Sequence, residues 1–184
     1  RDDGILPGWA VVPADIANGQ SKRMVILLAH VLPVLLLGGW VSTGGGGSFN
    51  QGCSVGWMQG WPLCQGAIIP EGMDNPAVHA AWVHRLAVLV VGVVLTIGFL
   101  KFRSEAEGRA TSLQWIVGLG ALAFLLNILV GAGYVVMGTG PDGFSEHMSL
   151  LHMSLGTDSF LLIAFAYVLC KMNTNDDLSD SEEE

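Results

Sequence analysis

Four stretches of this sequence are each long and apolar enough to cross a lipid bilayer as a helix. They cover residues 24–41, 83–100, 113–137 and 150–170. A helix needs roughly 20 predominantly apolar residues to span the hydrocarbon core. Hydrophobic residues make up 51% of the chain and charged residues only 13%, which is too apolar for an ordinary soluble domain of this size. The sequence therefore predicts an all-α, integral membrane, four-helix bundle.

The distribution of Lys and Arg predicts which way the bundle faces. Inner loops of membrane proteins are enriched in these residues, and here seven of the eight lie in the segments 1–23, 101–112 and 171–184. The outer loops are then 42–82 and 138–149, and both termini lie inside. No secretory signal precedes the first stretch, and because the chain begins at Arg1 we expect its extreme N-terminus to have been trimmed.

The net charge of −8 arises largely from the last segment, 171–184, which ends in DLSDSEEE. With almost no apolar residues to bury, this segment is expected to be a disordered, solvated tail. No basic patch is present to neutralise phosphates, so nucleic acid is not expected as a partner.

The three cysteines are separated by this topology. Cys53 and Cys64 share the long outer loop, where a disulfide can persist, and Cys170 lies at the inner end of the fourth stretch, where thiols stay reduced. A bridge between Cys53 and Cys64 is therefore the natural pairing.

Ionisable residues inside a membrane span are costly and are candidates for function. His84 and His152 begin the second and fourth stretches, which both run inward, so the two imidazoles lie at similar depth. Two neutral imidazoles at one level of a helical bundle can hold a haem iron from both faces. Zinc and copper fit less well, because each needs more converging ligands.

The other ionisable residues leave alternatives open. Arg85 either pairs with a haem propionate or extends to the lipid headgroups. Asp158 is about 9 Å deeper than His152 and is either hydrogen-bonded to neighbours or part of a proton path. His30 lies too deep to join the histidine pair, and a structural hydrogen bond is its simpler role. His79 and His147 are expected to be ordinary residues of the outer loops.

The sequence also resembles the haem A synthase family. The matching motifs are LLLGGWVSTGGGG, WPLCQGAIIP and VHRLAVLVVG in this order, and HMSLG matches more loosely. The resemblance covers about two thirds of the chain. It implies a multi-pass enzyme of a prokaryotic cell membrane or the mitochondrial inner membrane, which oxidises haem O to haem A for a terminal oxidase. It also implies that His84 and His152 hold haem (haem B, haem O or haem A) and that Cys53 and Cys64 form the outer-loop cysteine pair.

Three features depart from the family pattern. The family glutamate three residues before the first histidine is Ala81 here, so Asp158, Glu146 or Glu71 would have to supply the catalytic carboxylate. The two cysteines are more widely spaced than in most members. Many members have eight spans rather than four, so a four-span chain is expected to form a homo-oligomer or to join oxidase-assembly partners.

Two alternatives to the enzyme remain open. One is a non-catalytic b-type haem subunit, for electron transfer or as an accessory of a respiratory complex, which the alanine at position 81 favours. The other is a haem-free membrane scaffold, in which His84, His152 and Asp158 serve helix association only.

Overall fold

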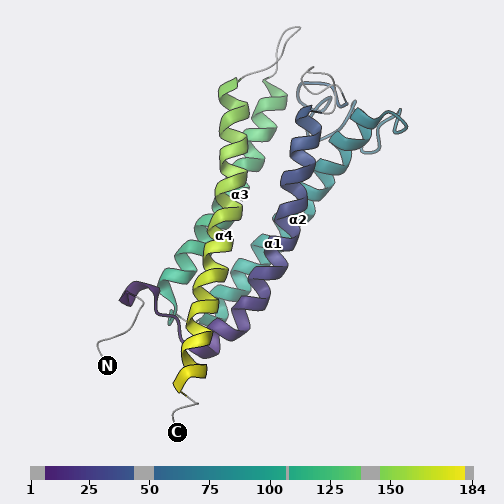
Figure 1. The fold of residues 1–184 in the computed structure, drawn as a ribbon. Helices are drawn as coiled ribbons and strands as arrows, with labels where there is room; N and C mark the ends of the chain where they lie inside the picture. The colour runs from purple at the N-terminus through teal and green to yellow at the C-terminus, as the bar shows by residue number, and fades with distance from the viewer. Residues whose placement is uncertain (1–6, 44–51, 107, 138–145, 181–184) are drawn as a thin grey trace.

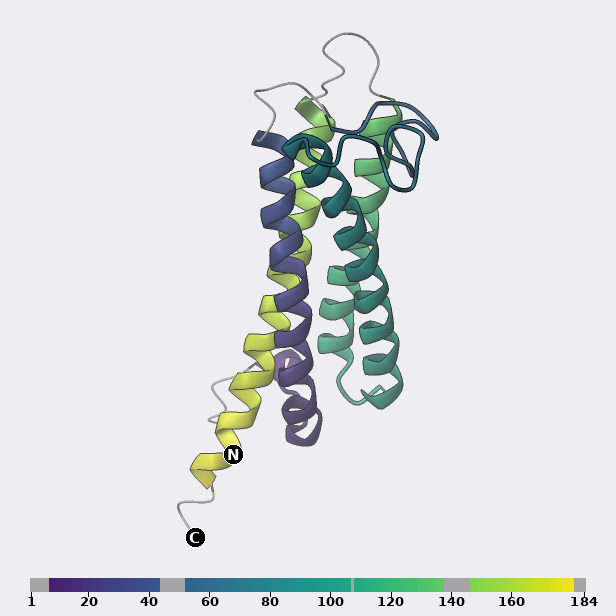
Figure 2. The ribbon, with the colours of Figure 1, turned by 90° about the vertical axis from the view of Figure 1, so that its right-hand side faces the viewer.

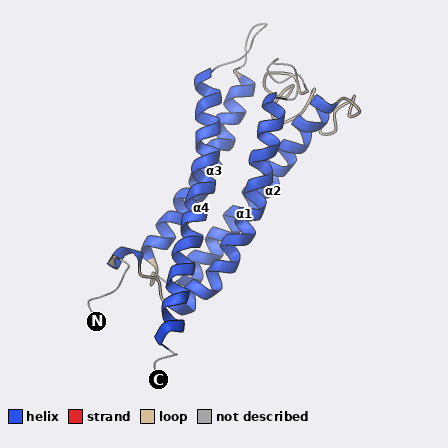
Figure 3. Ribbon diagram, viewed as in Figure 1, coloured by secondary structure: helices blue, strands red, loops and turns tan. Residues whose placement is uncertain are grey.

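The computed structural model describes residues 7–43, 52–106, 108–137 and 146–180 and is almost entirely helical (Figure 1, Figure 3). A short 3-10 helix, η1 (Gly8–Ala10), precedes four long helices. These are α1 (Ala14–Thr43), α2 (Pro76–Ala106), α3 (Thr111–Val136) and α4 (Glu146–Asp180). The prediction of an all-α chain with four long apolar helices is confirmed.

The four helices run alternately up and down the bundle (Figure 1, Figure 2). Each packs against its neighbour in the chain, and α1 also packs against α4, so that α2 and α4 lie diagonally opposite each other. The loop between α1 and α2 lies at one end of the bundle, and η1 and the C-terminal end of α4 lie at the other. The helices bearing His84 and His152 are therefore separated by the interior of the bundle.

All four helices are long and apolar enough to cross a membrane, and their outward faces are rich in exposed large hydrophobic side chains. An apolar exterior of this extent requires a lipid environment. The chain is a multi-pass integral membrane protein. Its helices extend beyond the predicted spans; α1 begins at Ala14 rather than at residue 24, because its first turns are amphipathic and bury Ile16 and Ala17 against the bundle.

Small residues bring the helix backbones close together. A side chain at Gly120 of α3 would meet Ile163 of α4 at 3.2 Å, and one at Gly118 would meet Phe99 of α2 at 3.1 Å. Gly92 and Gly98 of α2 are in similar contact with α3 and α1. Close approach of this kind supplies the van der Waals contact that holds helices together in lipid.

At the end of the bundle opposite the disulfide loop, here called the inner end after the predicted orientation, α4 continues past the predicted span. α4 continues to Asp180, and Asn173 is buried, where its amide accepts a hydrogen bond from Val12 N (2.8 Å) and donates one to Ala10 O (3.0 Å). These contacts with the chain before α1 hold the helix beyond residue 170. Residues 181–184 lie outside the described part.

Ion pairs also join elements at the inner end. Arg23 of α1 pairs with Glu105 of α2, with a second contact of 2.8 Å between Arg23 Nη2 and Glu105 Oε1. Arg109, in the turn between α2 and α3, pairs with Asp15 of α1 at 3.0 Å. Exposed pairs such as these contribute little to stability. Their basic residues gather at the end opposite the disulfide loop, as expected of an inner face, and the predicted location of both termini inside stays a prediction.

Candidate functional site

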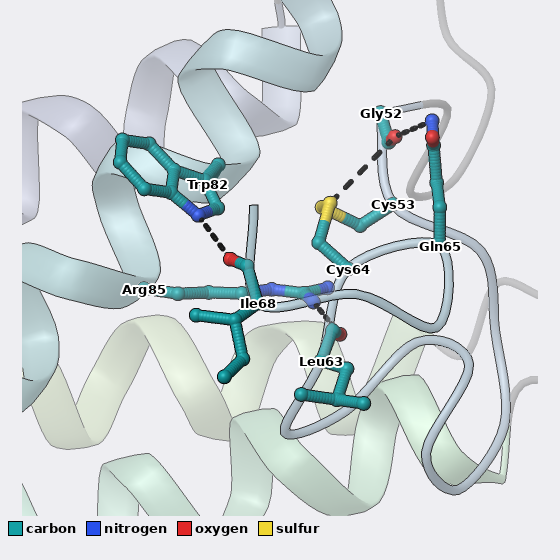
Figure 4. Close-up of a disulfide and its surroundings, with 8 residues drawn as sticks. All are labelled: Gly52, Cys53, Leu63, Cys64, Gln65, Ile68, Trp82 and Arg85. Carbon is teal, nitrogen blue, oxygen red and sulfur yellow. Dashed lines mark hydrogen bonds between the residues drawn. A yellow bond between two sulfur atoms is a disulfide. The ribbon is translucent and has the colours of Figure 1, made fainter. Parts of the chain in front are cut away.

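The described part of the outer loop, residues 52–75, is built around a disulfide. Cys53 and Cys64 are bonded, as predicted, with Cα atoms 4.7 Å apart, and both are buried (Figure 4). Cys170 is a free, buried cysteine. Gly52 allows the loop to touch α2, since a Cβ atom there would lie 2.1 Å from the Ala77 carbonyl oxygen. The sequence therefore places a compact, cross-linked loop directly on the outer end of α2.

Three hydrogen bonds fasten this loop to the helices beneath it. Trp82 Nε1 donates to Ile68 O (2.7 Å) and Arg85 Nη1 donates to Leu63 O (2.6 Å), so two side chains of α2 hold the loop (Figure 4). Gly56 N donates to Val135 O, near the end of α3, at 3.1 Å. The loop thus joins the α1–α2 hairpin to the α3–α4 hairpin at this end of the bundle, where it lies over α2 and α3 (Figure 2).

Ala81 lies under the disulfide. Its side chain is 4% exposed and packs in a small apolar cluster with Cys53, Cys64 and Val78. A carboxylate at this position would enter a buried, apolar space beside the sulfur atoms. The small side chain of Ala81 therefore fits under the loop, whereas a glutamate side chain would require the apolar cluster to rearrange.

His152 of α4 is held against α3. Its Nδ1 atom lies 3.0 Å from the Asn127 carbonyl oxygen, and its ring lies directly over Gly131. A carbonyl only accepts a hydrogen bond, so Nδ1 carries the proton and Nε2 has its lone pair available for a metal. The ring is half-buried.

His84 of α2 is held against α1 in a similar way. Its ring lies over Gly38, with Cε1 3.3 Å from the position of a Cβ atom there, and the Val34 backbone interacts with the ring. The Nδ1 atom is buried and completes no well-formed hydrogen bond within the described residues. This unpartnered nitrogen is unusual, because buried polar atoms are normally paired.

The two histidines lie at about the same depth in the bundle. Gly156 of α4 contacts Leu35 of α1, with 3.0 Å between a would-be Cβ atom and Leu35 Cδ2. His152 lies about 6 Å above Gly156 along α4, and Gly38, which carries the His84 ring, lies about 4.5 Å above Leu35 along α1. The imidazoles are also close enough to interact electrostatically.

These residues fit a haem better than a bare metal ion. Within the described residues, no three His, Cys, Asp or Glu side chains converge on one point. A zinc or copper site needs such convergence, whereas a haem can be held by one or two imidazoles. His84 and His152, at one depth and the first with an unpartnered buried nitrogen, would be the two imidazoles that hold it.

The remaining predicted site residues lie apart from the histidine pair. Asp158 is about 120° around α4 from His152 and lines an apolar groove on the outer α3–α4 face. Glu146 and Glu71 are exposed, at the start of α4 and in the loop. His30 Nδ1 donates a hydrogen bond to Ile26 O of its own helix at 2.7 Å, in accord with the structural role expected of it.

Fold and site together define a membrane four-helix bundle with two histidines at one depth, near the end that carries the disulfide loop. The chain is distantly homologous to haem A synthases. It is 30% identical over 145 residues to haem A synthase of Alkalihalophilus pseudofirmus, a match that covers 76% of this chain and 44% of that protein. It is 27% identical over 153 residues to haem A synthase of Bacillus licheniformis, covering 83% of this chain and 44% of that protein.

A further relative carries a different name. Protoheme IX farnesyltransferase of Haloarcula marismortui is 29% identical over 120 residues, covering 64% of this chain and 23% of that protein. The chain spans about half the length of the haem A synthases it matches. No protein-family model matches the chain, and no solved structure matches it.

Three residues that contact the histidines were missed from the sequence: Gly38, Gly131 and Asn127. A glycine in an apolar span has many possible roles, so neither glycine stood out. Asn127 is the one amide in the middle of the third stretch, and that isolated polar residue was the available signal.

Proposed function

We propose that this chain binds haem between His84 and His152 in the outer half of the bundle. The observation that supports the proposal is the pair of half-buried imidazoles at one depth, on diagonal helices. Bound haem would supply a redox-active iron. The chain itself would supply the two axial nitrogens, an apolar interior and a loop that excludes water from above.

We further propose that the activity is that of a haem A synthase-type oxidoreductase, which converts haem O to haem A for a terminal oxidase. Distant homology to haem A synthases over most of the chain supports this assignment. Arg85 is next to His84 and donates to the loop carbonyl of Leu63, and its guanidinium is the proposed partner of a haem propionate. Asp158 and Glu146 remain the proposed carboxylates, and either would need another chain or a rearrangement to approach the haem.

A second candidate function is a non-catalytic b-type haem subunit of a respiratory membrane complex. A specific observation favours it: every acidic side chain that the structure describes is exposed, and none lies in the interior near the histidines. Ala81, at the position of the family glutamate, packs in the apolar cluster around the disulfide. The proposed haem ligands, His84 and His152, are therefore present, but no described acidic side chain lies beside them to accept a proton.

Extraction of the bound haem distinguishes these functions. The full chain is expressed in a host that makes haem O, purified in detergent, and its haem identified by absorption spectrum and mass. Haem O together with its oxidised products supports the enzyme, and haem B alone supports the subunit. His84→Ala and His152→Ala should each abolish the six-coordinate haem spectrum. A wild-type chain that carries no haem, and takes up none on titration, would exclude both functions.

Replacement of Ala81 by Glu tests the enzyme specifically. If the missing carboxylate limits catalysis, Ala81→Glu should raise the yield of haem A in cells. Ala80→Glu, which adds a charge at the neighbouring buried position, is the matched control for general damage. Absence of haem A in both the wild type and Ala81→Glu would leave the subunit as the function.

A further inference from the structure

The structure shows the same contact twice, once in each helical hairpin. In the α3–α4 hairpin the His152 ring covers Gly131, and in the α1–α2 hairpin the His84 ring covers Gly38. Asn127, whose carbonyl meets His152, is four residues before Gly131. Val34, whose backbone interacts with His84, is four residues before Gly38. Each imidazole therefore rests on one helical turn of the preceding helix, defined by a glycine and the carbonyl one turn before it.

The distances show how little room each glycine leaves. A Cβ atom at Gly131 would lie 2.7 Å from His152 Cε1 and 3.0 Å from Nδ1, closer than van der Waals contact allows. A Cβ atom at Gly38 would lie 3.3 Å from His84 Cε1 and 3.9 Å from both ring nitrogens. In both hairpins the Cε1 edge of the ring is nearest to the glycine. A methyl group would therefore push the ring away, by more at Gly131 than at Gly38.

We infer that Gly38 and Gly131 are positioning residues, which fix the two imidazoles in the bundle interior so that their Nε2 atoms can serve as axial ligands. This inference rests on the proposed haem site. The hydrogen bond from His152 Nδ1 to Asn127 O sets the tautomer of that ring, and Gly38 holds the His84 ring, whose Nδ1 is buried without a hydrogen-bond partner in the described part of the chain. Partners of this kind orient the ligand ring and raise its basicity.

The experiment uses the full chain in detergent, titrated with haem B, and compares Gly131→Ala with Gly133→Ala. A Cβ atom at Gly133, on the same helix, would meet only the flexible ends of Met137 and Met148, at 3.4 and 3.5 Å. We expect Gly131→Ala to weaken haem binding by about 10- to 100-fold, the usual effect of disturbing the groups that orient a metal ligand. Gly133→Ala should change it less than about twofold.

The electron paramagnetic resonance spectrum of the ferric protein gives a readout that stability alone does not move. Its g values depend on how the two imidazole planes are turned relative to each other, so Gly131→Ala should shift them and Gly133→Ala should not. Gly38→Ala and its neighbour Gly39→Ala form a second matched pair, because a Cβ atom at Gly39 would meet nothing within 4 Å. The milder overlap at Gly38 keeps the test valid if Gly131→Ala does not fold.

The outcomes separate this inference from the proposed function. If the wild type binds no haem, or if His84→Ala and His152→Ala bind it as well as the wild type, the haem site itself is wrong. If the histidine variants lose haem but each glycine variant matches its control in affinity and in g values, the positioning role alone is overturned.

Discussion

At the scale of single residues, the interior below His152 contains polar atoms without partners. Asn127 uses its backbone carbonyl for His152, but its side-chain Oδ1 is buried and unpaired within the described residues. Ser159, about two turns further along α4, is fully buried, and its hydroxyl is also unpaired there. Such atoms usually bind an internal water or cost free energy. The bundle interior is therefore more polar near the histidines than its composition indicates.

We expect Ser159→Ala to leave the free energy of unfolding unchanged or to raise it by up to about 1 kcal/mol, because it removes a buried hydroxyl that has no partner. Thermal unfolding of the purified protein in detergent measures the effect. Thr157→Ala, at an exposed position two residues away, is the control and should change stability by less than about 0.5 kcal/mol. A loss of more than about 1 kcal/mol in Ser159→Ala would show that the hydroxyl is bonded, to a water or to another group.

At the scale of elements, the outer loop behaves as a structural unit of its own. Its disulfide, the Ala81 cluster and its bonds to Trp82 and Arg85 all lie on one side of the loop, against α2. Its single described backbone bond to α3 runs from Gly56 to Val135. The loop is thus firmly attached to its own hairpin and more lightly to the other.

We expect the double variant Cys53→Ser, Cys64→Ser to lose about 2–3 kcal/mol of unfolding free energy, because the bridge closes a short loop of sequence separation 11. The measurement is thermal unfolding under oxidising conditions. Under reducing conditions, the stability of the wild type should fall to that of the double variant. Cys170→Ser removes the buried free thiol and serves as the control, since reductant should not change the difference between that variant and the wild type. Equal stability of the double variant and the oxidised wild type would show that the bridge does not stabilise the loop.

At the scale of the whole molecule, one face of the bundle is incompletely apolar. The groove between α3 and α4, about 540 Å³, is lined by leucines and by Asp158, which is exposed on an outward face of a spanning helix. A carboxylate facing lipid near the middle of a span costs about 2.5–3.5 kcal/mol. We therefore expect a second copy of the chain to cover this face and to shield Asp158 from lipid.

We expect the chain to dimerise in mild detergent through this groove, and Asp158→Ala to raise the dimer dissociation constant about three- to tenfold, as loss of an interhelical hydrogen bond does. Sedimentation equilibrium over a range of detergent concentrations measures it. Thr157→Ala, beside it on α4, should have less effect. A chain that stays monomeric at every concentration, or a dimer unaffected by Asp158→Ala, would contradict this prediction.

Much of this architecture follows from simple patterns in the sequence, and the part that does not depends on contacts between distant residues. The apolar stretches predict the four helices because membrane thickness sets their length, and the topology that follows places Cys53 and Cys64 together. The extension of α4 beyond residue 170 was missed because it depends on Asn173 meeting the chain near Val12. Gly38 and Gly131 were missed for the same reason, since their role appears only when each is seen under a ring from another helix.

The hydrogen bond between Gly56 N and Val135 O bears on how the proposed haem would reach the interior of the bundle. Because the loop is joined to both hairpins, we expect the proposed haem to enter from the lipid side, or before the Cys53–Cys64 disulfide forms. Chains whose disulfide is kept reduced should then take up haem faster than chains whose disulfide has already formed.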